Sequence, residues 1–397
     1  MSRFSILLCA VLLLASTVRG QHVRISKSPD AKVTVDASAL RTTGGAAIAM
    51  RKALLDDISR SGWMGLGAPG QATILLKGAA TDANGQLRFE CQATDAAGTA
   101  YINGTYSVPP AQALELAHQV AHDLVTKVTG KPTYFLSKLA MLGTANGARE
   151  LYIADSSAQN RRQITHDRAG AIRPRWSPDN RSITYTSFIK HYPDVYSIDL
   201  ANSTRSCVAS YPGVNSGGAI SPDGRSRALI LSKDGNPDLY IQDIATRRLT
   251  RLTYTPRAVE GSPEWSPDGT RLVFVSDSSG TPQLYILPRS GGNPVRLTTT
   301  GAQNVAPDWG ANNLIACQTL LGGKFQISVI DPATKQSRII TDLAAAYEEP
   351  SWAPDGRHIA AARAVNYQYS VYLLDTMGDK PVALTTFGDW RAPAWQH

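Results

Sequence analysis

The sequence predicts an α/β N-terminal domain followed by an all-β six-bladed β-propeller. A turn segment of the type EWSPDG recurs at a nearly constant interval, short runs of strand-forming residues follow each copy, and the residues before the first copy lack this interval. We therefore expect three regions: a signal peptide at residues 1–20, a small α/β domain at residues 21–131 and the propeller at residues 132–397.

The first residues have the features of an export signal. Arg3 supplies a positive charge, and residues 4–15 form an apolar run with the length of a secretory signal, too short to span a bilayer. Val18 and Gly20 are small enough for the positions before a cleavage site. No later segment has 18 consecutive apolar residues. We therefore expect an exported protein, cleaved after Gly20, without a transmembrane segment in the mature chain.

Two helices are expected before the repeats. The segment GGAAIAMRKALLDDISRSG places Ile48, Leu55 and Ile58 near one helical face, and Gly62 follows as a stop signal. The amphipathic segment PAQALELAHQVAHDLVTKVTGKP has Pro110 at its start and Gly130 at its end. Between them, ATILLKGAAT, QLRFECQAT and TAYINGTYSV are expected to be strands joined by the hairpin turns DANG and DAAG. This mixture predicts a small α/β domain that packs against the propeller.

Six repeat units follow this domain. Their anchor residues, each directly before a turn or the chain end, lie at steps of 43 to 45 residues and are Trp176, Ile220, Trp265, Trp309, Trp352 and Trp395. Each unit offers about four short strands, and a period of about 44 residues with four strands is typical of a propeller blade. A parallel solenoid is the alternative, but its β repeats are usually shorter.

The last repeat is short, and this predicts how the ring closes. The segment PAWQH provides only the start of one strand, whereas residues 133–165 provide the rest of a unit without an anchor before it. If the two pieces join in one mixed blade, both open sheet edges disappear. We therefore expect a ring closed by the C-terminal strand, with Trp395 buried.

The SPDG segments have the composition of tight turns. Proline presets φ, aspartate bonds to nearby backbone and glycine accepts a positive φ. The repeated carboxylates Asp179, Asp223, Asp268 and Asp355 are therefore interpreted as turn residues. An active site breaks the symmetry of a repeat, so recurrence in the blades favours a structural role.

Other motifs give no catalytic, cofactor or metal site. GLGAPG at residues 65–70 has the letters of a dinucleotide-binding motif, but it follows a helix and precedes a strand, the reverse of that motif, so we expect a loop. His118 and His122 lie four residues apart near Glu115, without a further ligand to complete a metal site. The sequence contains no G-x-S-x-G segment of the serine hydrolases.

The charge distribution argues against a nucleic-acid-binding protein, and the cysteine spacing argues against a disulfide-rich protein. The net charge is +8, but the basic residues are dispersed, whereas nucleic-acid binding requires a clustered basic face. We therefore expect no nucleic-acid partner. Cys91, Cys207 and Cys317 are each separated by more than a hundred residues, which does not suit a disulfide framework. They are predicted to be buried free thiols.

The segments just upstream of the anchors vary from repeat to repeat, while the turns do not. We place these segments in loops at one face of the ring, where variable side chains on a rigid scaffold form binding sites. Their mixture of polar and aromatic residues suits a protein partner. The candidate partner-binding residues are Arg173, Asn215, Arg257, Glu260, Gln303, Asn304, Tyr347, Glu348, Glu349, Trp390 and Arg391.

The order of these regions resembles the TolB family, the periplasmic component of the Tol–Pal system of Gram-negative envelopes. The turns PRWSPDN, PEWSPDG and PSWAPDG and the terminal PAWQH carry the resemblance, which covers nearly the whole chain. The sequence departs from the family pattern at Ile220, where the anchor is not tryptophan. It departs again at DWGANN, which lacks the proline and the Asp-Gly turn.

The resemblance implies a non-enzymatic, monomeric hub that supports outer-membrane integrity and constriction during division. The propeller mouth would bind Pal, a peptidoglycan-associated lipoprotein, and colicins would exploit the same site. The mature N-terminus would bind TolA, with the candidate residues His22, Val23, Arg24, Ile25 and Asp30. The alternative is an exported propeller enzyme or carbohydrate-binding protein, which an asymmetric cluster of carboxylates or histidines in the channel would favour.

Overall fold

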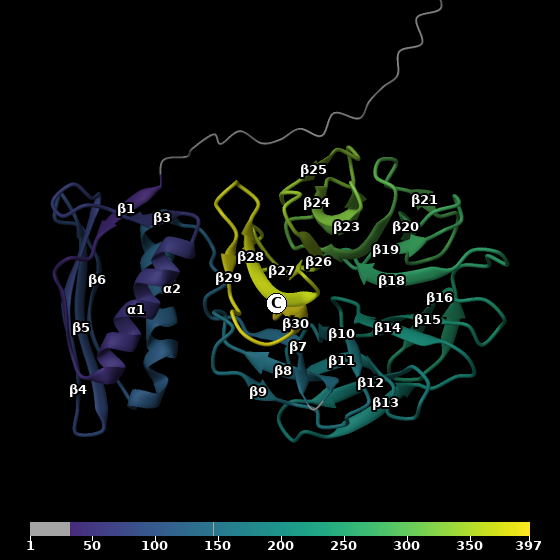
Figure 1. The fold of residues 1–397 in the computed structure, drawn as a ribbon, viewed down its shortest axis with the longest axis horizontal. Coiled ribbons are helices and arrows are strands. Elements are labelled where there is room, and N and C mark those ends of the chain that lie inside the picture. The colour runs from purple at the N-terminus through teal and green to yellow at the C-terminus, as the bar shows by residue number, and fades with distance from the viewer. Residues whose placement is uncertain (1–31, 146) are drawn as a thin grey trace, which may run out of the picture.

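An α/β domain lies beside a ring of six four-stranded sheets (Figure 1). This arrangement confirms the predicted fold class. The computed structural model describes residues 32–145 and 147–397. The predicted signal peptide and the candidate residues for TolA, His22 to Asp30, lie outside the described residues. Within residues 32–145 and 147–397, no helix is long and apolar enough to cross a membrane.

One mixed sheet and two helices form the N-terminal domain. The sheet has the strand order β3-β1-β4-β5-β6, and β2 also pairs with β4. Its elements are β1 (Val33–Asp36), β2 (Leu40–Thr43), α1 (Gly45–Arg60), β3 (Met64–Leu66), β4 (Ile74–Ala83), β5 (Gln86–Asp95), β6 (Ala100–Val108), the 3₁₀ turn η1 (Pro110–Gln112) and α2 (Ala113–Thr129). The three short strands β1 to β3 were not predicted, and β3 includes the first two residues of the GLGAPG segment, which we had expected to be a loop throughout.

The buried face of α1 differs from the predicted one. Ile48 is 60% exposed, whereas Ala47, Met50 and Leu54 are buried. The buried face also includes Asp57, whose Oδ2 lies 2.6 Å from Nδ1 of the buried His118 on α2. A charged residue in the buried stripe hides the apolar period, and this is why the sequence pattern placed Ile48 on the wrong side.

Each blade of the ring is an antiparallel sheet that begins with an inner strand. The six inner strands contact one another around the central channel, and the other three strands of each blade follow outward. The blades are β30 (Trp390–Trp395), β7 (Leu139–Ala145), β8 (Ala148–Ala154) and β9 (Arg162–Gln163); β10 (Ala171–Trp176), β11 (Ser182–Ser187), β12 (Asp194–Asp199) and β13 (Arg205–Ala209); β14 (Asn215–Ile220), β15 (Ser226–Leu231), β16 (Asp238–Asp243) and β17 (Leu249–Arg251); β18 (Glu260–Trp265), β19 (Arg271–Ser276), β20 (Gln283–Pro288) and β21 (Val295–Arg296); β22 (Asn304–Trp309), β23 (Ile315–Leu321), β24 (Lys324–Ile330) and β25 (Ser337–Ile339); and β26 (Ala346–Trp352), β27 (His358–Val365), β28 (Gln368–Asp375) and β29 (Val382–Ala383).

The ring closes as predicted. Strand β30 pairs with β7, with Trp395 opposite Leu139, so one blade combines the last strand of the propeller with its first three. Trp395 is 1% exposed. We call this sheet the closing blade. Because β30 also contacts β26 and β10 on either side, the closing blade completes the ring of packed blades.

The anchor tryptophans join neighbouring blades. Nε1 of Trp265 donates to the carbonyl oxygen of Ala219, 3.0 Å away on the preceding inner strand. Nε1 of Trp176 donates in the same way to the carbonyl oxygen of Ala394 at 2.9 Å. The indole thus fills the space between two blades and also satisfies a backbone acceptor there.

The turn interpretation of the repeated aspartates is confirmed. In the turn after Trp265, Oδ1 of Asp268 accepts hydrogen bonds from Ser266 Oγ at 2.5 Å and from the backbone N–H of Thr270 at 3.0 Å. Gly269 has a φ of 67°, which favours glycine. The hydrogen bonds from Ser266 and Thr270 lower the pKa of Asp268 to about 2, so the carboxylate stays charged in the role of a turn brace.

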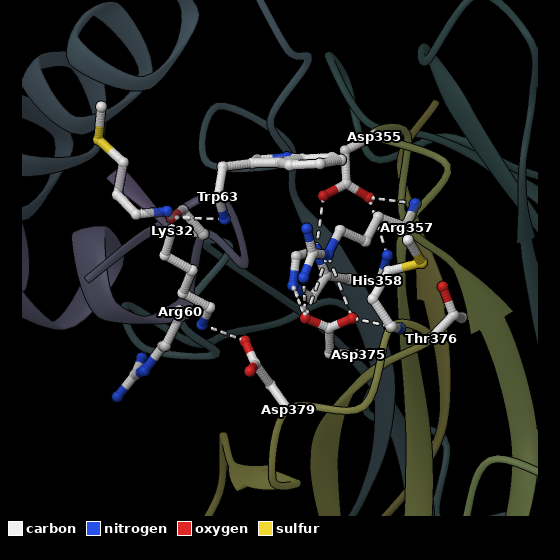
Figure 2. A network of polar contacts seen from close by, with 12 residues as sticks. Lys32, Arg60, Trp63, Asp355, Arg357, His358, Asp375, Thr376 and Asp379 are labelled. Carbon is white, nitrogen blue, oxygen red and sulfur yellow. Dashed lines mark hydrogen bonds and ion pairs between the residues drawn. The ribbon is translucent and has the colours of Figure 1, made fainter. Parts of the chain in front are cut away.

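The N-terminal domain packs against the closing blade and the blade β26–β29 through a polar network (Figure 2). The Arg357 guanidinium lies 4.2 Å from the centre of the Trp63 ring and donates from Nη2 to Asp375 Oδ2 at 2.7 Å. Lys32 forms an ion pair with Asp379 at the same boundary. The ring of Tyr134, in the linker, lies 5.3 Å from that of Trp395. These contacts tie the domain to the ring.

Candidate functional site

The two faces of the ring differ in what they carry. The SPDG-type turns lie on one face, which we call the turn face, and the N-terminal domain contacts this side through Arg357 and Trp395. Antiparallel order places the connections between blades, and the turns between the second and third strands, on the opposite face, which we call the loop face.

Every inner strand carries a bulge three residues before its anchor. The pairing register shifts at each of these positions. The bulged residues all have positive φ and are Arg173 (54°), Gly217 (92°), Ser262 (50°), Ala306 (49°), Glu349 (53°) and Ala392 (46°). A bulge turns an additional side chain toward one side of a strand. Here four of the bulged residues, Arg173, Ala306, Glu349 and Ala392, line one small cavity, and Arg173 donates a hydrogen bond to Ser262 of another blade.

Charged side chains gather in this channel. Arg175 on β10 donates from Nε to Glu264 Oε2 on β18, 2.9 Å away and two blades along. Asp308 accepts from the backbone N–H of Trp352 at 2.6 Å, and Glu349 accepts from that of Ala392 at 2.8 Å. These three carboxylates and Arg175 form an asymmetric cluster of the kind that would favour an enzyme or a carbohydrate-binding protein. Each carboxylate is already bonded to another blade, so the cluster ties the ring together.

The buried position of the cluster shifts its pKa values. Burial disfavours the charged form of Arg175, but Glu264 and Asp308 outweigh this and raise its pKa. Burial lowers the pKa of Arg173, with a further contribution from Arg175. Burial also raises the pKa of Glu264, and Asp308 adds to the rise, while Arg175 opposes it. On the turn-face side the channel widens into a cavity of about 250 Å³ lined by Trp265, Trp309 and other anchors.

The structure corrects the position of most candidate partner-binding residues. We expected them in loops, but only Arg257 and Gln303 precede an inner strand, and the others lie on the inner strands themselves. The physical reason is that these strands begin five or six residues before their anchors, so pairing with the second strand extends into the variable segment.

Four of these candidates are buried inside blades. They are Asn215, Glu260, Asn304 and Tyr347. Asn215, for example, holds its own preceding loop by accepting from Tyr211 N at 2.8 Å and donating to Tyr211 O at 2.8 Å. Their side chains support the loops, and contact with a partner from these positions would need the loops to move.

Other candidates reach the channel or its rim. Arg173 and Glu349 line a small cavity of about 50 Å³. Arg391 lies 3.6 Å from the ring centre of Tyr369 and donates from Nε to Asp389 at 3.1 Å. Burial and the neighbouring Glu349 raise the pKa of the half-buried Glu348, against the effect of Arg391. Trp390 is half-buried and packs edge-on against Tyr152, with ring centres 5.0 Å apart.

The sequence analysis missed a set of exposed apolar side chains on the loop face. They lie in the connections between blades or in the turns between second and third strands, and they are Tyr192 (73% exposed), Tyr254 (70%), Leu343 (57%), Tyr367 (91%) and Phe387 (87%). For the four aromatic members of this set, an aromatic residue inside a loop is the signal that could have found them. Exposed apolar side chains that share a face mark interaction sites.

The histidine pair on α2 is divided between two partners. His118 contacts Asp57, and Nδ1 of His122 lies 2.7 Å from Thr133 Oγ1. Across residues 32–145 and 147–397, no three His, Cys, Asp or Glu side chains are grouped to hold a metal ion. The three described cysteines are free as predicted, but Cys207 is only half-buried. Its strand, β13, is the outermost of its blade, and this explains the exposure.

Comparisons with known proteins agree with this architecture. A solved structure of TolB from Acinetobacter baumannii superposes with a TM-score of 0.80 at 24% identity, over 94% of this chain and 99% of that one. At this identity the likeness shows the fold, including the α/β domain beside the ring. A structure described as a putative TolB from Agrobacterium tumefaciens has a TM-score of 0.54 at 19% identity and covers 65% of this chain and 91% of that one.

Sequence relatives carry the same name. The Tol-Pal system protein TolB of Desulfosudis oleivorans is 31% identical over 201 residues, which are 50% of this chain and 45% of the relative. That of Francisella tularensis subsp. tularensis is 34% identical over 147 residues, 35% of this chain and 34% of the relative. The matched region thus spans less than half of either relative. The sequence profile described as the TolB beta propeller domain matches residues 125–397, well over half of the chain, and the chain therefore belongs to the TolB β-propeller family.

Proposed function

We propose that this protein is a non-enzymatic interaction hub of a Tol–Pal system, located in the periplasm after cleavage of residues 1–20. The loop face of the propeller binds a peptidoglycan-associated lipoprotein of the Pal type, and the N-terminal segment around His22 to Asp30 binds TolA. In this role the monomeric protein supports outer-membrane integrity and constriction during division, and colicins would use the same face. Membership of the TolB family and the Tol-Pal names of its relatives support this proposal.

The loop face is the observation that carries the proposal. Tyr367 and Phe387 expose 91% and 87% of their surface there, and the channel among the inner strands has charged walls. Aromatic side chains around a polar centre are typical of protein interfaces, in which a few aromatic anchors provide most of the binding energy. The N-terminal domain packs on the opposite side, so it leaves this surface available to a partner.

Isothermal titration of the purified chain with the soluble domain of a Pal-type lipoprotein tests this site. Tyr367→Ser and Phe387→Ser should each weaken binding about tenfold or more, because each removes an aromatic anchor. The matched controls Val295→Ser and Met377→Ser, also exposed but next to the turn face, should leave the affinity unchanged. Equal losses in both pairs of variants would contradict a loop-face site.

The TolA contact needs its own experiment, since the residues concerned lie outside the described structure. Deletion of residues 21–31 should abolish capture of TolA and leave lipoprotein binding intact. Retained capture of TolA would contradict the proposed segment, and loss of both interactions would show that the deletion damages the whole protein.

The second candidate, an exported enzyme or carbohydrate-binding protein, has one observation in its favour, the carboxylates Glu264, Asp308 and Glu349 in the channel. Their bonds to Arg175, Trp352 and Ala392 argue against a free general base. Turnover of a glycan or peptide by the purified chain, abolished by Glu264→Gln, would decide for this alternative.

A further inference from the structure

The turn-face end of the channel is a cavity that the proposed hub function does not use. It has a volume of about 250 Å³, and all of its lining residues belong to the propeller, so the N-terminal domain forms no part of its wall. Small-molecule sites are usually somewhat larger, so this cavity suits a small ligand. The proposed lipoprotein site lies on the loop face, at the other end of the channel.

The two places where the repeat departs from its pattern both lie on the wall of this cavity. Ile220 stands where the other five repeats have an anchor tryptophan, and Ala311 stands at the place of the turn proline. Isoleucine is smaller than tryptophan and therefore leaves space between the blades. A repeat that is otherwise kept loses its symmetry here, as expected at a binding site.

The mouth of the cavity is apolar. The turn prolines Pro178, Pro222 and Pro267 line it and are exposed, as is Ala311. Ile220 is half-buried on the same wall. Exposed apolar side chains that surround one opening indicate a ligand with an apolar body.

One buried carboxylate on the wall has an oxygen without a partner. Asp308 is 5% exposed, and its Oδ2 accepts from the backbone N–H of Trp352 at 2.6 Å. Its Oδ1 has no hydrogen bond among residues 32–145 and 147–397, and unlike Nε1 of Trp352 it keeps accessible surface. A ligand in the cavity can therefore reach this oxygen.

The charges around Asp308 favour a cation. The wall carries two carboxylates, Asp308 and Glu264, against one guanidinium, that of Arg175. Both oxygens of Glu264 already accept hydrogen bonds, from Arg175 Nε at 2.9 Å and from the backbone N–H of Trp265 at 3.1 Å. His397 adds no positive charge at pH 8, because burial of its imidazole and Arg175 lower its pKa against the effect of Asp308. One negative charge therefore remains uncompensated.

An organic cation fits this wall better than a metal ion does. Calcium takes six to eight oxygen ligands, and in the described part of the chain no three His, Cys, Asp or Glu side chains are grouped to hold a metal. An alkylammonium group instead needs only hydrogen-bond acceptors for its N–H donors. Its alkyl chain also has apolar surface to match the prolines at the mouth.

We propose that the turn-face end of the channel binds a small primary alkylamine. The ammonium group pairs with Oδ1 of Asp308, and the alkyl chain lies against Ile220 and the turn prolines. A lysine side chain carries the same ammonium group, but a cavity of about 250 Å³ leaves little room for a peptide backbone, which favours a free amine.

Titration calorimetry of the intact chain with hexylamine at pH 8 tests the proposal, since a primary alkylamine keeps its charge at this pH. Hexylamine should bind saturably at one site. Hexanol and hexanoate, which lack the positive charge, should bind at least tenfold more weakly. Nα-acetyl-lysine amide should also bind at least tenfold more weakly, and this separates a free amine from the side chain of a protein.

Asp308→Asn should weaken hexylamine binding at least tenfold. Asparagine keeps an oxygen for the backbone N–H of Trp352 but loses the charge, so the fold should persist. Asp331→Asn is the matched control, because Asp331 lies in another turn on the same face, accepts from the backbone N–H of Ala333 at 2.8 Å and is not part of the cavity wall. This control should leave the affinity unchanged.

Ile220→Trp provides an independent test, because it restores the repeat residue and fills the cavity without changing a charge. It should also weaken hexylamine binding at least tenfold, while circular dichroism shows that the fold is retained. The proposal is overturned if hexylamine does not bind, if hexanol, hexanoate or acetyl-lysine amide binds equally well, if calcium chloride displaces hexylamine at equal concentration, or if both variants retain full affinity.

Discussion

Arg175 and Glu264 lie two blades apart on β10 and β18, and their side chains meet across the channel with 2.9 Å between Nε and Oε2. Their side chains are 23% and 14% exposed. Because the pair joins blades that are not neighbours, it stabilises the ring by linking two blades across the channel.

Arg175→Met should therefore destabilise the propeller. It leaves Glu264 beside Asp308 without compensation, and the expected loss is about 3 kcal/mol, the lower end of the range for a broken buried pair. Urea denaturation measures this loss. Arg88→Met breaks the exposed pair with Glu90 and should cost about 0.5 kcal/mol or less. Similar losses of stability for the two variants would show that the channel pair contributes no more to the stability of the ring than an exposed pair does.

Two anchor tryptophans allow the indole hydrogen bond to be measured separately from packing. Trp265 donates to Ala219 O at 3.0 Å, whereas Nε1 of the buried Trp352 has no partner among the described residues. Trp265→Phe should cost about 1 kcal/mol more than Trp352→Phe, because only the first leaves a backbone acceptor unpaired. The comparison uses denaturation midpoints of the two variants, and equal costs would assign the anchors to packing alone.

Gly62 tests the contact between the domains. It has a φ of 75°, and a Cβ there would lie 2.4 Å from Nε of Arg357, which Trp63 and Asp375 hold in place. Gly85 has a similar φ of 74° but open space around it. Gly85→Ala should cost about 1 kcal/mol from the left-handed backbone alone.

Gly62→Ala should cost clearly more than Gly85→Ala, since it also displaces the Arg357 guanidinium. Limited proteolysis of the linker near Lys131 should become faster only in the Gly62 variant. If both variants behave alike, Arg357 does not hold the two domains together.

Glu260 predicts a pH dependence of stability. Burial raises its pKa from about 4.5 to about 7, although Thr255 and Ser276 donate hydrogen bonds to it. The folded state therefore favours the protonated form, and stability falls as pH rises from about 4.5 to about 7, because the unfolded chain ionises first.

Glu260→Gln should remove this decline, as seen in denaturation midpoints between pH 5 and pH 8. Asp268→Asn serves as the control. The pKa of Asp268 is about 2, so its contribution to stability is constant between pH 5 and pH 8, and the decline should persist in this variant. A decline of the same size in the Gln variant would assign the pH dependence to another group.

The repeat itself was predictable because its signals are local. Trp265, Asp268 and Gly269 act within one turn, and a period of constant length reveals them without tertiary information. Closure by β30 was predictable for the same reason, since the unit at residues 133–165 lacked an anchor. The strands β1 and β3 were not predictable, because they are short and pair in parallel through a crossover that leaves no hairpin signal.

The site was harder to predict, because bulges decide which side chains face the channel. Arg173 and Glu349 adopt positive φ although they are not glycine. The residue type at these positions therefore does not predict the shift in register. Likewise, the arrangement of Glu264 and Arg175 depends on blades that lie two units apart. The exposure of Tyr367 and Phe387 follows from the loop lengths, which the period does not fix.

The pairing of β30 with β7 also sets the order of events during synthesis. Lys138 donates to Gln396, which lies 258 positions later in the chain, so the closing blade is incomplete until the very last strand of the ring has been made. Until then the edge of β7 that pairs with β30 is unpaired. A nascent chain of this kind needs protection against aggregation until β30 is available. The ring then closes in a single late step, when β30 pairs with β7.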